Sequence, residues 1–167
     1  MEDGREYVVR PLRMEDAEAA AALIRLAFTT QTVATDPPAS ARTETTASIT
    51  ASLATESQGG FGAWSANTLA GCVLWQIKPR GLYLGRLSVH PSHRGKAIAR
   101  ALLDAVAAQA RHLALPRLLL STRLALADNR RLFARCGFTE TEQHAHPGYP
   151  YPTFVDMERA VGALRRS

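Results

Sequence analysis

The chain is poor in cysteine. Its 167 residues include only Cys72 and Cys136, and neither has a second cysteine or a histidine at the spacing of a metal site. The sequence therefore predicts no disulfide framework and no bound metal. A chain of this length buries about 70% of the surface that its unfolded form exposes, so its core needs neither device. Two unpartnered thiols are typical of a reducing compartment, and we expect a cytoplasmic protein.

Long hydrophobic runs are also missing. No stretch approaches the roughly 18 apolar residues of a membrane-spanning helix. The first ten residues, MEDGREYVVR, contain no apolar signal-peptide core. Repeats, low-complexity tails and domain linkers are absent as well. We therefore expect no membrane partner and a single domain over residues 1–167.

Lysine is the rare cation. Only Lys78 and Lys96 are present, so nearly all of the formal charge of +5 comes from arginine. Such an excess suits either nucleic acid or a small polyanionic ligand. The arginines are scattered along the chain and are not interleaved with aromatic residues. This pattern predicts no nucleic-acid partner and places most of the arginines at a solvated surface.

The hydrophobic pattern predicts a chain in which strands and helices alternate. Strands are expected at 7–10, 61–65, 69–78, 82–89, 117–122, 138–146 and 153–159. Helices are expected at 14–28, 39–57, 95–113 and 128–136, with a turn at 58–60 and a helix-stop glycine at Gly137. The strand–helix–strand unit over 82–122 should be parallel and its neighbours antiparallel. The predicted fold class is α/β, a single-domain mixed sheet of about seven strands with helices on both faces.

The most informative segment joins the strand at 82–89 to the helix that follows it. Between them lies Arg94-Gly95-Lys96-Ala97-Ile98-Ala99. Backbone N–H groups at a helix start have no intrahelical acceptors, and they lie at the positive end of the helix dipole. The small residues of this segment let an anion approach those groups, and its two cations attract it. The pattern predicts a phosphate or pyrophosphate site, although an ordinary helix start has the same elements.

Two motifs and the order of elements resemble the GNAT superfamily of N-acetyltransferases, which use acyl-CoA donors. Arg94, Ala97 and Ala99 match the pyrophosphate loop of that family, with Ala97 where glycine is usual. We expect alanine to be tolerated there if the backbone stays helical. The segment 129–138, NRRLFARCGF, resembles the late helix of the family, which ends in an aromatic residue, three further residues and Gly-Phe.

The resemblance implies acetyl-CoA as co-substrate and direct attack by an amine, without a covalent acyl-enzyme. The strand before the loop would pair with the pantetheine arm and the thioester carbonyl. The loop would hold the pyrophosphate, and Asn129 would bond the pantetheine unless it only caps its helix. The implied cofactor-binding residues are Leu87, Ser88, Val89, Arg94, Gly95, Lys96, Ala97, Ala99, Arg100, Asn129 and Phe133.

The acid and the base are less well defined. Phe133 stands where many members of the family carry a tyrosine that protonates the leaving thiolate. The thiolate therefore leaves unassisted, or it takes a proton from water or from one of the candidates Tyr149, Tyr151 and His146. The candidate bases are Glu44, His144 and His146, acting directly or through water. Each of these side chains has a plainer interpretation, as a solvated residue or as turn packing.

The acceptor is expected to be an amine, either a small molecule or a peptide, and Glu140 and Glu142 hint that it is cationic. A non-catalytic acyl-CoA-binding or sensing module is the alternative function. Phe133 and the lack of an obvious base favour that alternative. A homodimer is plausible, because members of the family that the chain resembles often pair through their late strands.

Overall fold

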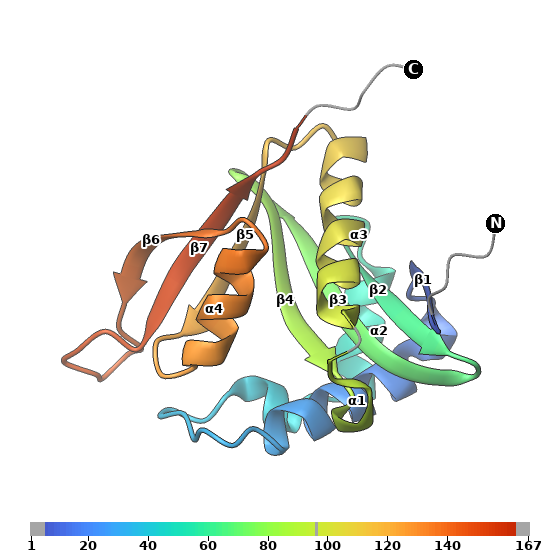
Figure 1. Ribbon diagram of the computed structural model, residues 1–167, viewed down its shortest axis with the longest axis horizontal. Coiled ribbons are helices and arrows are strands. Elements are labelled where there is room, and N and C mark those ends of the chain that lie inside the picture. Colours follow the sequence, from blue (N-terminus) through green and yellow to red (C-terminus); the bar gives the residue numbers. More distant parts are fainter. Residues whose placement is uncertain (1–5, 96, 163–167) are drawn as a thin grey trace.

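A computed structural model describes residues 6–95 and 97–162 of the chain. Its strands form one mixed sheet with helices on both faces, as the sequence predicts (Figure 1). From edge to edge the strands are β1 (Val8–Pro11), β2 (Gln58–Ser65), β3 (Thr68–Lys78), β4 (Gly81–Val89), β5 (Arg117–Arg123), β7 (Phe154–Ala160) and β6 (Thr139–His144). The helices are α1 (Ala17–Thr29), α2 (Thr46–Ala54), α3 (Ile98–His112) and α4 (Ala127–Arg135). Three short 3-10 turns accompany them: η1 (Met14–Asp16), η2 (Ser40–Thr43) and η3 (Pro91–His93).

The sheet opens in its middle. Every neighbouring pair of strands is antiparallel except β4 and β5, which are parallel and pair only at Leu82–Leu118 and Tyr83–Leu119. Beyond these positions the two strands separate (Figure 1). A gap therefore forms at their carboxyl ends, where open α/β sheets bind ligands.

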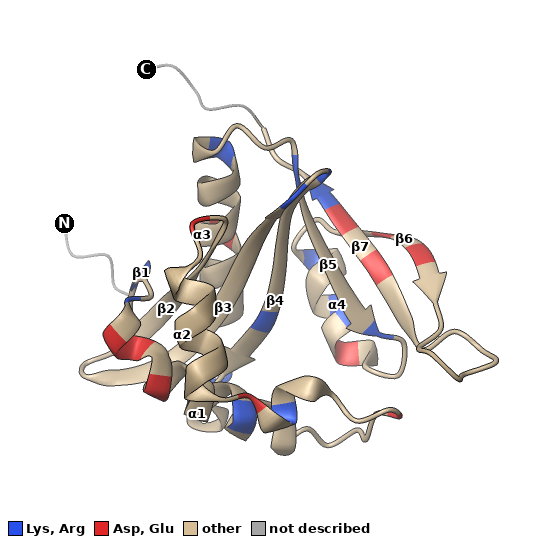
Figure 2. Ribbon diagram, turned by 180° about the vertical axis from the view of Figure 1, so that it is seen from behind, with Lys and Arg blue, Asp and Glu red and all other residues tan. Residues whose placement is uncertain are grey.

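Two hydrophobic clusters cover the two faces of the sheet. On one face α1 and α2 pack on β2, β3 and β4, and Ile24 and Ile49 are fully buried there. On the other face α3 packs on the same strands and on β5, and Leu102 and Val106 are fully buried. On the α1 face, no helix of the described residues covers β5, β7 and β6 (Figure 2). No helix among the described residues is long and apolar enough to cross a membrane.

Two predictions of local structure before β3 are wrong. The helix expected at 39–57 is interrupted at Glu44, whose extended backbone separates η2 from α2. Thr45 then caps α2, because its side-chain oxygen accepts a hydrogen bond from the Ser48 N–H at 3.1 Å. The turn expected at 58–60 is instead the start of β2. Its glycines serve close packing: a Cβ on Gly59 would lie 2.5 Å from the Trp75 ring.

The helix expected from residue 95 begins three residues later, at Ile98. Gly95 and Ala97 both have left-handed backbones, with φ of 81° and 60°. The helical backbone that we expected for Ala97 is therefore wrong. A left-handed alanine costs about 1–2 kcal/mol, which glycine avoids. The departure from the usual glycine is thus a cost in backbone energy, while the methyl group remains small.

Helices α3 and α4 end in the same motif. In each, the backbone N–H two residues past the C-cap donates a hydrogen bond to the carbonyl five residues earlier. The bond runs from Leu115 to Ala110 at 2.8 Å in α3, and from Phe138 to Phe133 at 3.0 Å in α4. The motif requires one left-handed residue. That residue is the predicted Gly137 in α4, with φ of 92°, but Ala114 in α3, with φ of 57°.

We expect Ala114→Gly to raise the free energy of unfolding by up to about 1 kcal/mol, because glycine removes the strain of a left-handed alanine. Gly137→Ala is the matched opposite change and should lower it by a similar amount. A Cβ there meets only the Arg159 side chain, at 3.5 Å, so backbone strain dominates. Urea denaturation of both variants measures the effect, and a destabilised Ala114→Gly would contradict it.

Candidate active site

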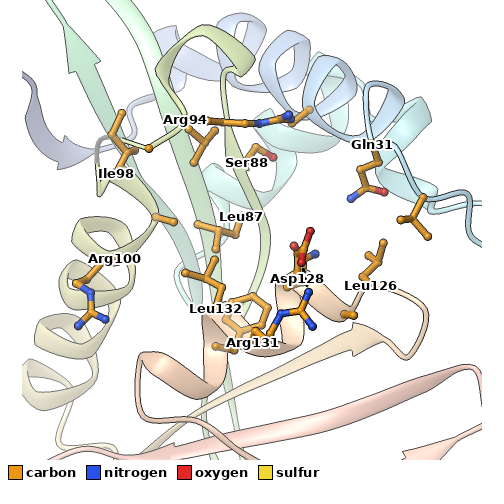
Figure 3. Close-up of a pocket in the computed structure, with 18 of the residues that line it drawn as sticks. Gln31, Leu87, Ser88, Arg94, Ile98, Arg100, Leu126, Asp128, Arg131 and Leu132 are labelled. Atoms are coloured by element: carbon orange, nitrogen blue, oxygen red, sulfur yellow. Dashed lines mark hydrogen bonds and ion pairs between the residues drawn. The ribbon is translucent and has the colours of Figure 1, made fainter.

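A cavity of about 960 Å³ lies at the gap between β4 and β5 (Figure 3). Its walls come from β4, from the start of α3 with the loop before it, from the start of α4, and from the end of α1 with the residues that follow. The predicted cofactor residues on these walls are Leu87, Ser88, Val89, Arg94, Gly95, Ala97, Ala99, Arg100, Asn129 and Phe133. Only Lys96 is missing from the predicted set, and it lies outside the described residues. The fold therefore brings the set together around one space.

The cavity is strongly basic. Arg94, Arg100, Arg131 and Arg135 line it, whereas Asp128 is the only carboxylate among the described lining residues. Asp128 is itself ion-paired with Arg131. The start of α3 adds partial positive charge, since no side chain caps its first N–H groups. Such an arrangement suits a ligand that carries several phosphate charges.

The edge of β4 is available to a ligand as well. Beyond Tyr83 this strand has no partner on the β5 side among the described residues. A β-bulge places Arg86 and Leu87 opposite the single residue Val73, and Arg86 takes a left-handed φ of 57°. Unpaired backbone groups seek hydrogen-bond partners, so this edge offers donors and acceptors to an extended ligand in the gap.

Glu44 holds the bulge from the α1 face. Its side chain is almost fully buried, and its Oε2 lies 3.0 Å from Nε of Arg86. Its Oε1 accepts a hydrogen bond from the Thr45 N–H at 3.1 Å, and its backbone carbonyl accepts one from Arg25 at 2.7 Å. Both carboxylate oxygens are thus engaged. These contacts favour a positioning role for Glu44 over that of a base.

His146 and Tyr149 lie away from the cavity walls, in the loop between β6 and β7. The backbone N–H of His146 donates to the Thr153 hydroxyl at 2.9 Å, and its Nδ1 contacts the same hydroxyl. Its ring packs on Phe154, with centroids 4.8 Å apart. Burial, together with the positive charge of Arg123, holds the pKa of the His146 imidazole below its usual value. Its ring is therefore neutral at pH 7, as a base must be.

Tyr149 is committed to another contact. Its hydroxyl donates to Oδ1 of Asp36 at 2.6 Å. This hydrogen bond, with burial and the nearby carboxylate charge, raises the pKa of the Tyr149 hydroxyl. The contact joins the β6–β7 loop to the segment that follows α1.

That segment, residues 36–44, crosses the open side of the gap, and we term it the strap. Tyr149 holds Asp36 at one end, and Arg86 holds the other end through Glu44 and through the Ser40 hydroxyl at 3.1 Å. Between them, Nη1 of Arg123 donates to the carbonyl of Pro37 at 2.5 Å. Figure 1 shows the chain after α1 running below α4 toward the β6–β7 loop. The strap thus connects β4, β5 and that loop across the gap.

Sequence reasoning missed Arg86, Arg123 and Asp36, because it treated the arginines as a scattered, solvated set. One signal was available. Arg86 and Arg123 lie near the carboxyl ends of the two strands predicted to be parallel, which is where open α/β sheets bind ligands.

The structure weakens the prediction of a cationic acceptor, which was based on Glu140 and Glu142. Glu140 is held by Arg130 of α4 through two hydrogen bonds, at 2.6 and 3.1 Å. This pairing lowers the pKa of the Glu140 carboxyl. Glu142 lies 3.9 Å from Nε2 of His144 on the exposed edge strand. Neither residue lines the cavity.

Comparisons with known proteins agree with this geometry. Residues 21–138 match the model of the acetyltransferase (GNAT) family. No curated protein sequence matches the chain at a significant level. Three solved structures share the fold: ribosomal-protein-S18-alanine N-acetyltransferase from Escherichia coli, PaiA N-acetyltransferase from Thermoplasma acidophilum in complex with coenzyme A, and a spermidine N-acetyltransferase chimera from Vibrio cholerae and hSSAT.

The likeness to these structures extends over nearly the whole chain. The Escherichia coli protein has a TM-score of 0.73 at 20% identity, with 96% of each chain covered. The Thermoplasma protein has a TM-score of 0.75 at 17% identity, with 92% of this chain and 98% of its own covered. The chimera has a TM-score of 0.72 at 17% identity, with 93% and 95% covered.

We expect the His146 ring to titrate below pH 6.5, the usual imidazole value, and Arg123→Met to raise that pKa by removing a nearby positive charge. Because the folded-state pKa lies below the unfolded value, this histidine should lower the free energy of unfolding as the pH falls below about 6.5. NMR titration of the histidine rings, assigned with His146→Gln, measures the pKa. A wild-type value at or above 6.5 would contradict the expectation.

Proposed function

The chain belongs to the GNAT family of acetyltransferases, and on that premise we propose that it transfers an acetyl group from acetyl-CoA to an amine. The observation that carries the proposal is the single cavity that the anion loop, the unpaired edge of β4 and the start of α4 surround. The named acceptors of the structural neighbours, an alanine of a ribosomal protein and spermidine, differ in kind. Both a peptide and a small amine therefore fit the family.

The residues of the cavity fit coenzyme A. Arg94, Arg100 and the uncapped start of α3 would hold the pyrophosphate, and the small residues Gly95 and Ala97 leave the backbone open to it. The free edge of β4 would pair with the amide groups of the pantetheine arm. The side chain of Asn129 has no hydrogen-bond partner among the described residues, so it is free to bind that arm. When bound, acetyl-CoA supplies an acyl group on a thiol that is a good leaving group.

Backbone donors of β4 are suited to stabilise developing negative charge. An N–H group beyond the bulge, in the stretch from Leu87 to Val89, would donate to the thioester carbonyl oxygen. A single preorganised donor of this kind contributes about 10²–10³-fold in rate. The Glu44–Arg86 ion pair fixes the bulge, and so it fixes the direction in which these groups point.

His146 is the base that this reading favours. Its Nδ1 is occupied by Thr153, and its Nε2 has no hydrogen-bond partner among the described residues. A neutral imidazole at this position would accept the proton of the attacking ammonium, directly or through water. The amine nitrogen would then bond to the acyl carbon as the carbon–sulfur bond breaks, and the second proton that the nitrogen loses on becoming an amide would pass through water to the leaving thiolate. Tyr149 already donates to Asp36, which leaves it poorly placed as the acid.

A covalent acyl-cysteine has no support in the chain. Burial raises the pKa of the Cys72 thiol to about 12, so almost none of it is thiolate near neutral pH. Cys136 is buried as well. Direct transfer to the amine needs no such nucleophile.

Calorimetric titration with acetyl-CoA tests the cofactor site. We expect saturable binding by the wild type and a loss of at least about tenfold in affinity for Arg94→Glu, because the change places a carboxylate beside the phosphates. Lys78→Glu alters the net charge equally on an exposed strand end away from the cavity, and it should bind like the wild type. Equal binding by the Arg94 variant would remove the loop from the site.

Phe133→Tyr separates an active enzyme from an acyl-CoA-binding module that has lost its acid. Phe133 is buried, packs edge to face on Phe138 and lines the cavity. We expect the variant to change kcat by less than about threefold, because a thiolate of pKa near 8.5 leaves without protonation. Thiol release in the presence of an amine measures this rate. A gain well above tenfold would indicate a degenerate site instead.

A further inference from the structure

Arg123 is a partly buried cation that makes no ion pair within the described residues. Its only hydrogen bond there runs from Nη1 to the carbonyl of Pro37, although a guanidinium carries five N–H donors. Asp36 attracts its charge from beyond ion-pair distance, but burial is the larger effect and lowers the pKa of the guanidinium. Arg130, by contrast, donates twice to Glu140. Arg123 therefore retains N–H donors without a partner in partly buried surroundings.

The carboxylates around this end of the gap are already engaged. Asp36 accepts a hydrogen bond from Tyr149, and Glu44 is paired with Arg86. On β7, Asp156 accepts a hydrogen bond from Ser121 at 2.7 Å, and its other oxygen lies 2.7 Å from Nε2 of His144. The charged group left without an ion pair among the described residues here is thus a cation, which argues for an anionic group on the ligand.

Arg123 also lies beside the strap and the β6–β7 loop. It ends β5 at the gap, it contacts the strap, and its charge acts on His146 and Tyr149 of that loop. The strap contacts of Arg123 and Arg86, at Pro37 and Ser40, are three residues apart, so they are separated by at most about 11 Å of extended chain. The charge of Arg86 is balanced by Glu44, so a small ligand beside the strap would meet Arg123 as the cation without an ion pair.

We propose that Arg123 determines acceptor specificity by binding the carboxylate of a small amine that also carries a carboxylate group. This inference rests on the proposed acetyl transfer and gives its acceptor class. A guanidinium and a carboxylate form two parallel hydrogen bonds, which the neutral amide of the same acceptor does not match. A charge-assisted contact of this kind corresponds to roughly ten- to a hundredfold in kcat/KM.

Matched acceptors test the inference. Linear ω-amino acids of two to six carbons are compared with their primary amides, which have the same length and lack the charge. Thiol release from acetyl-CoA gives kcat/KM for each pair. We expect at least one acid to exceed its amide about tenfold or more in the wild type, and Arg123→Met to bring that ratio close to one. Arg123→Glu should invert the ratio in favour of a diamine of equal length.

Arg117→Met is the matched control, because Arg117 is a half-buried arginine of the same strand at its opposite end and on the same face. It should keep the wild-type ratio. A merely structural role for Arg123, through Pro37, would lower turnover of acids and amides alike and leave the ratio unchanged. If thermal melting shows that Arg123→Met does not fold, Arg123→Lys replaces it. Lysine keeps the positive charge but cannot donate two parallel hydrogen bonds, so it should lower the acid-to-amide ratio of kcat/KM only partway.

The outcomes separate the two proposals. Amides acetylated as well as acids by the wild type would overturn the role of Arg123 and leave acetyl transfer standing. Intact binding of acetyl-CoA with no acetylation of any acid in the panel would also overturn it. Failure to bind acetyl-CoA would overturn the proposed function, and the acceptor assignment with it. Calorimetry of an acid acceptor with the CoA-saturated protein gives a readout independent of turnover, in which Arg123→Met should weaken binding.

Discussion

The ion pair between the buried Glu44 carboxylate and the partly buried Arg86 guanidinium is the contact on which the site depends. Arg86 has a left-handed backbone at the bulge of β4, a conformation that costs about 1–2 kcal/mol for a residue with a Cβ. Its guanidinium is fixed by the carboxylate of Glu44, which also accepts a hydrogen bond from the N–H of Thr45, the N-cap of α2, while Arg25 of α1 holds the backbone carbonyl of Glu44. Removing Arg86 would leave the buried Glu44 carboxylate uncompensated, which costs about 3–5 kcal/mol in a fully buried pair and less here, because Arg86 is partly exposed. The bulge is thus maintained by groups from three separate elements.

The bulge in turn determines what each face of the gap offers. On the α3 face the gap is lined by arginines and by a helix start without a cap, so it favours phosphate groups. On the α1 face the strap and the β6–β7 loop bring together an imidazole held neutral, a tyrosine bound to Asp36 and the unpaired Arg123. The two faces meet at the unpaired edge of β4. The site therefore separates the holding of a polyanion from the handling of an acceptor and its proton.

Local patterns in the sequence predicted the mixed sheet and most of its helices. Leu102 and Val106 follow the helical period of α3 and are fully buried, and Gly137 ends α4 as expected. The errors arose where tertiary contacts override local preference. Glu44 breaks a helix because its carboxylate and its carbonyl are bound to residues far away in the chain, and Gly59 lies in a strand because the Trp75 ring occupies the space of a Cβ. The proposed role of Arg123 depends on its lack of an ion pair in the folded chain, and a local sequence pattern contains no information about such distant partners.

The strap has a mechanical consequence. The two halves of the sheet share backbone hydrogen bonds at only two register positions, whereas the strap ties them together through side chains near the opposite end of the gap. Any change in the width of the gap must therefore displace the strap. If a molecule in the gap alters that width, it alters the affinity of whatever the strap and Arg123 hold, and the coupling is equal in both directions. Coupling between the two ligands would then be a property of the sheet itself, in addition to any direct contact between them.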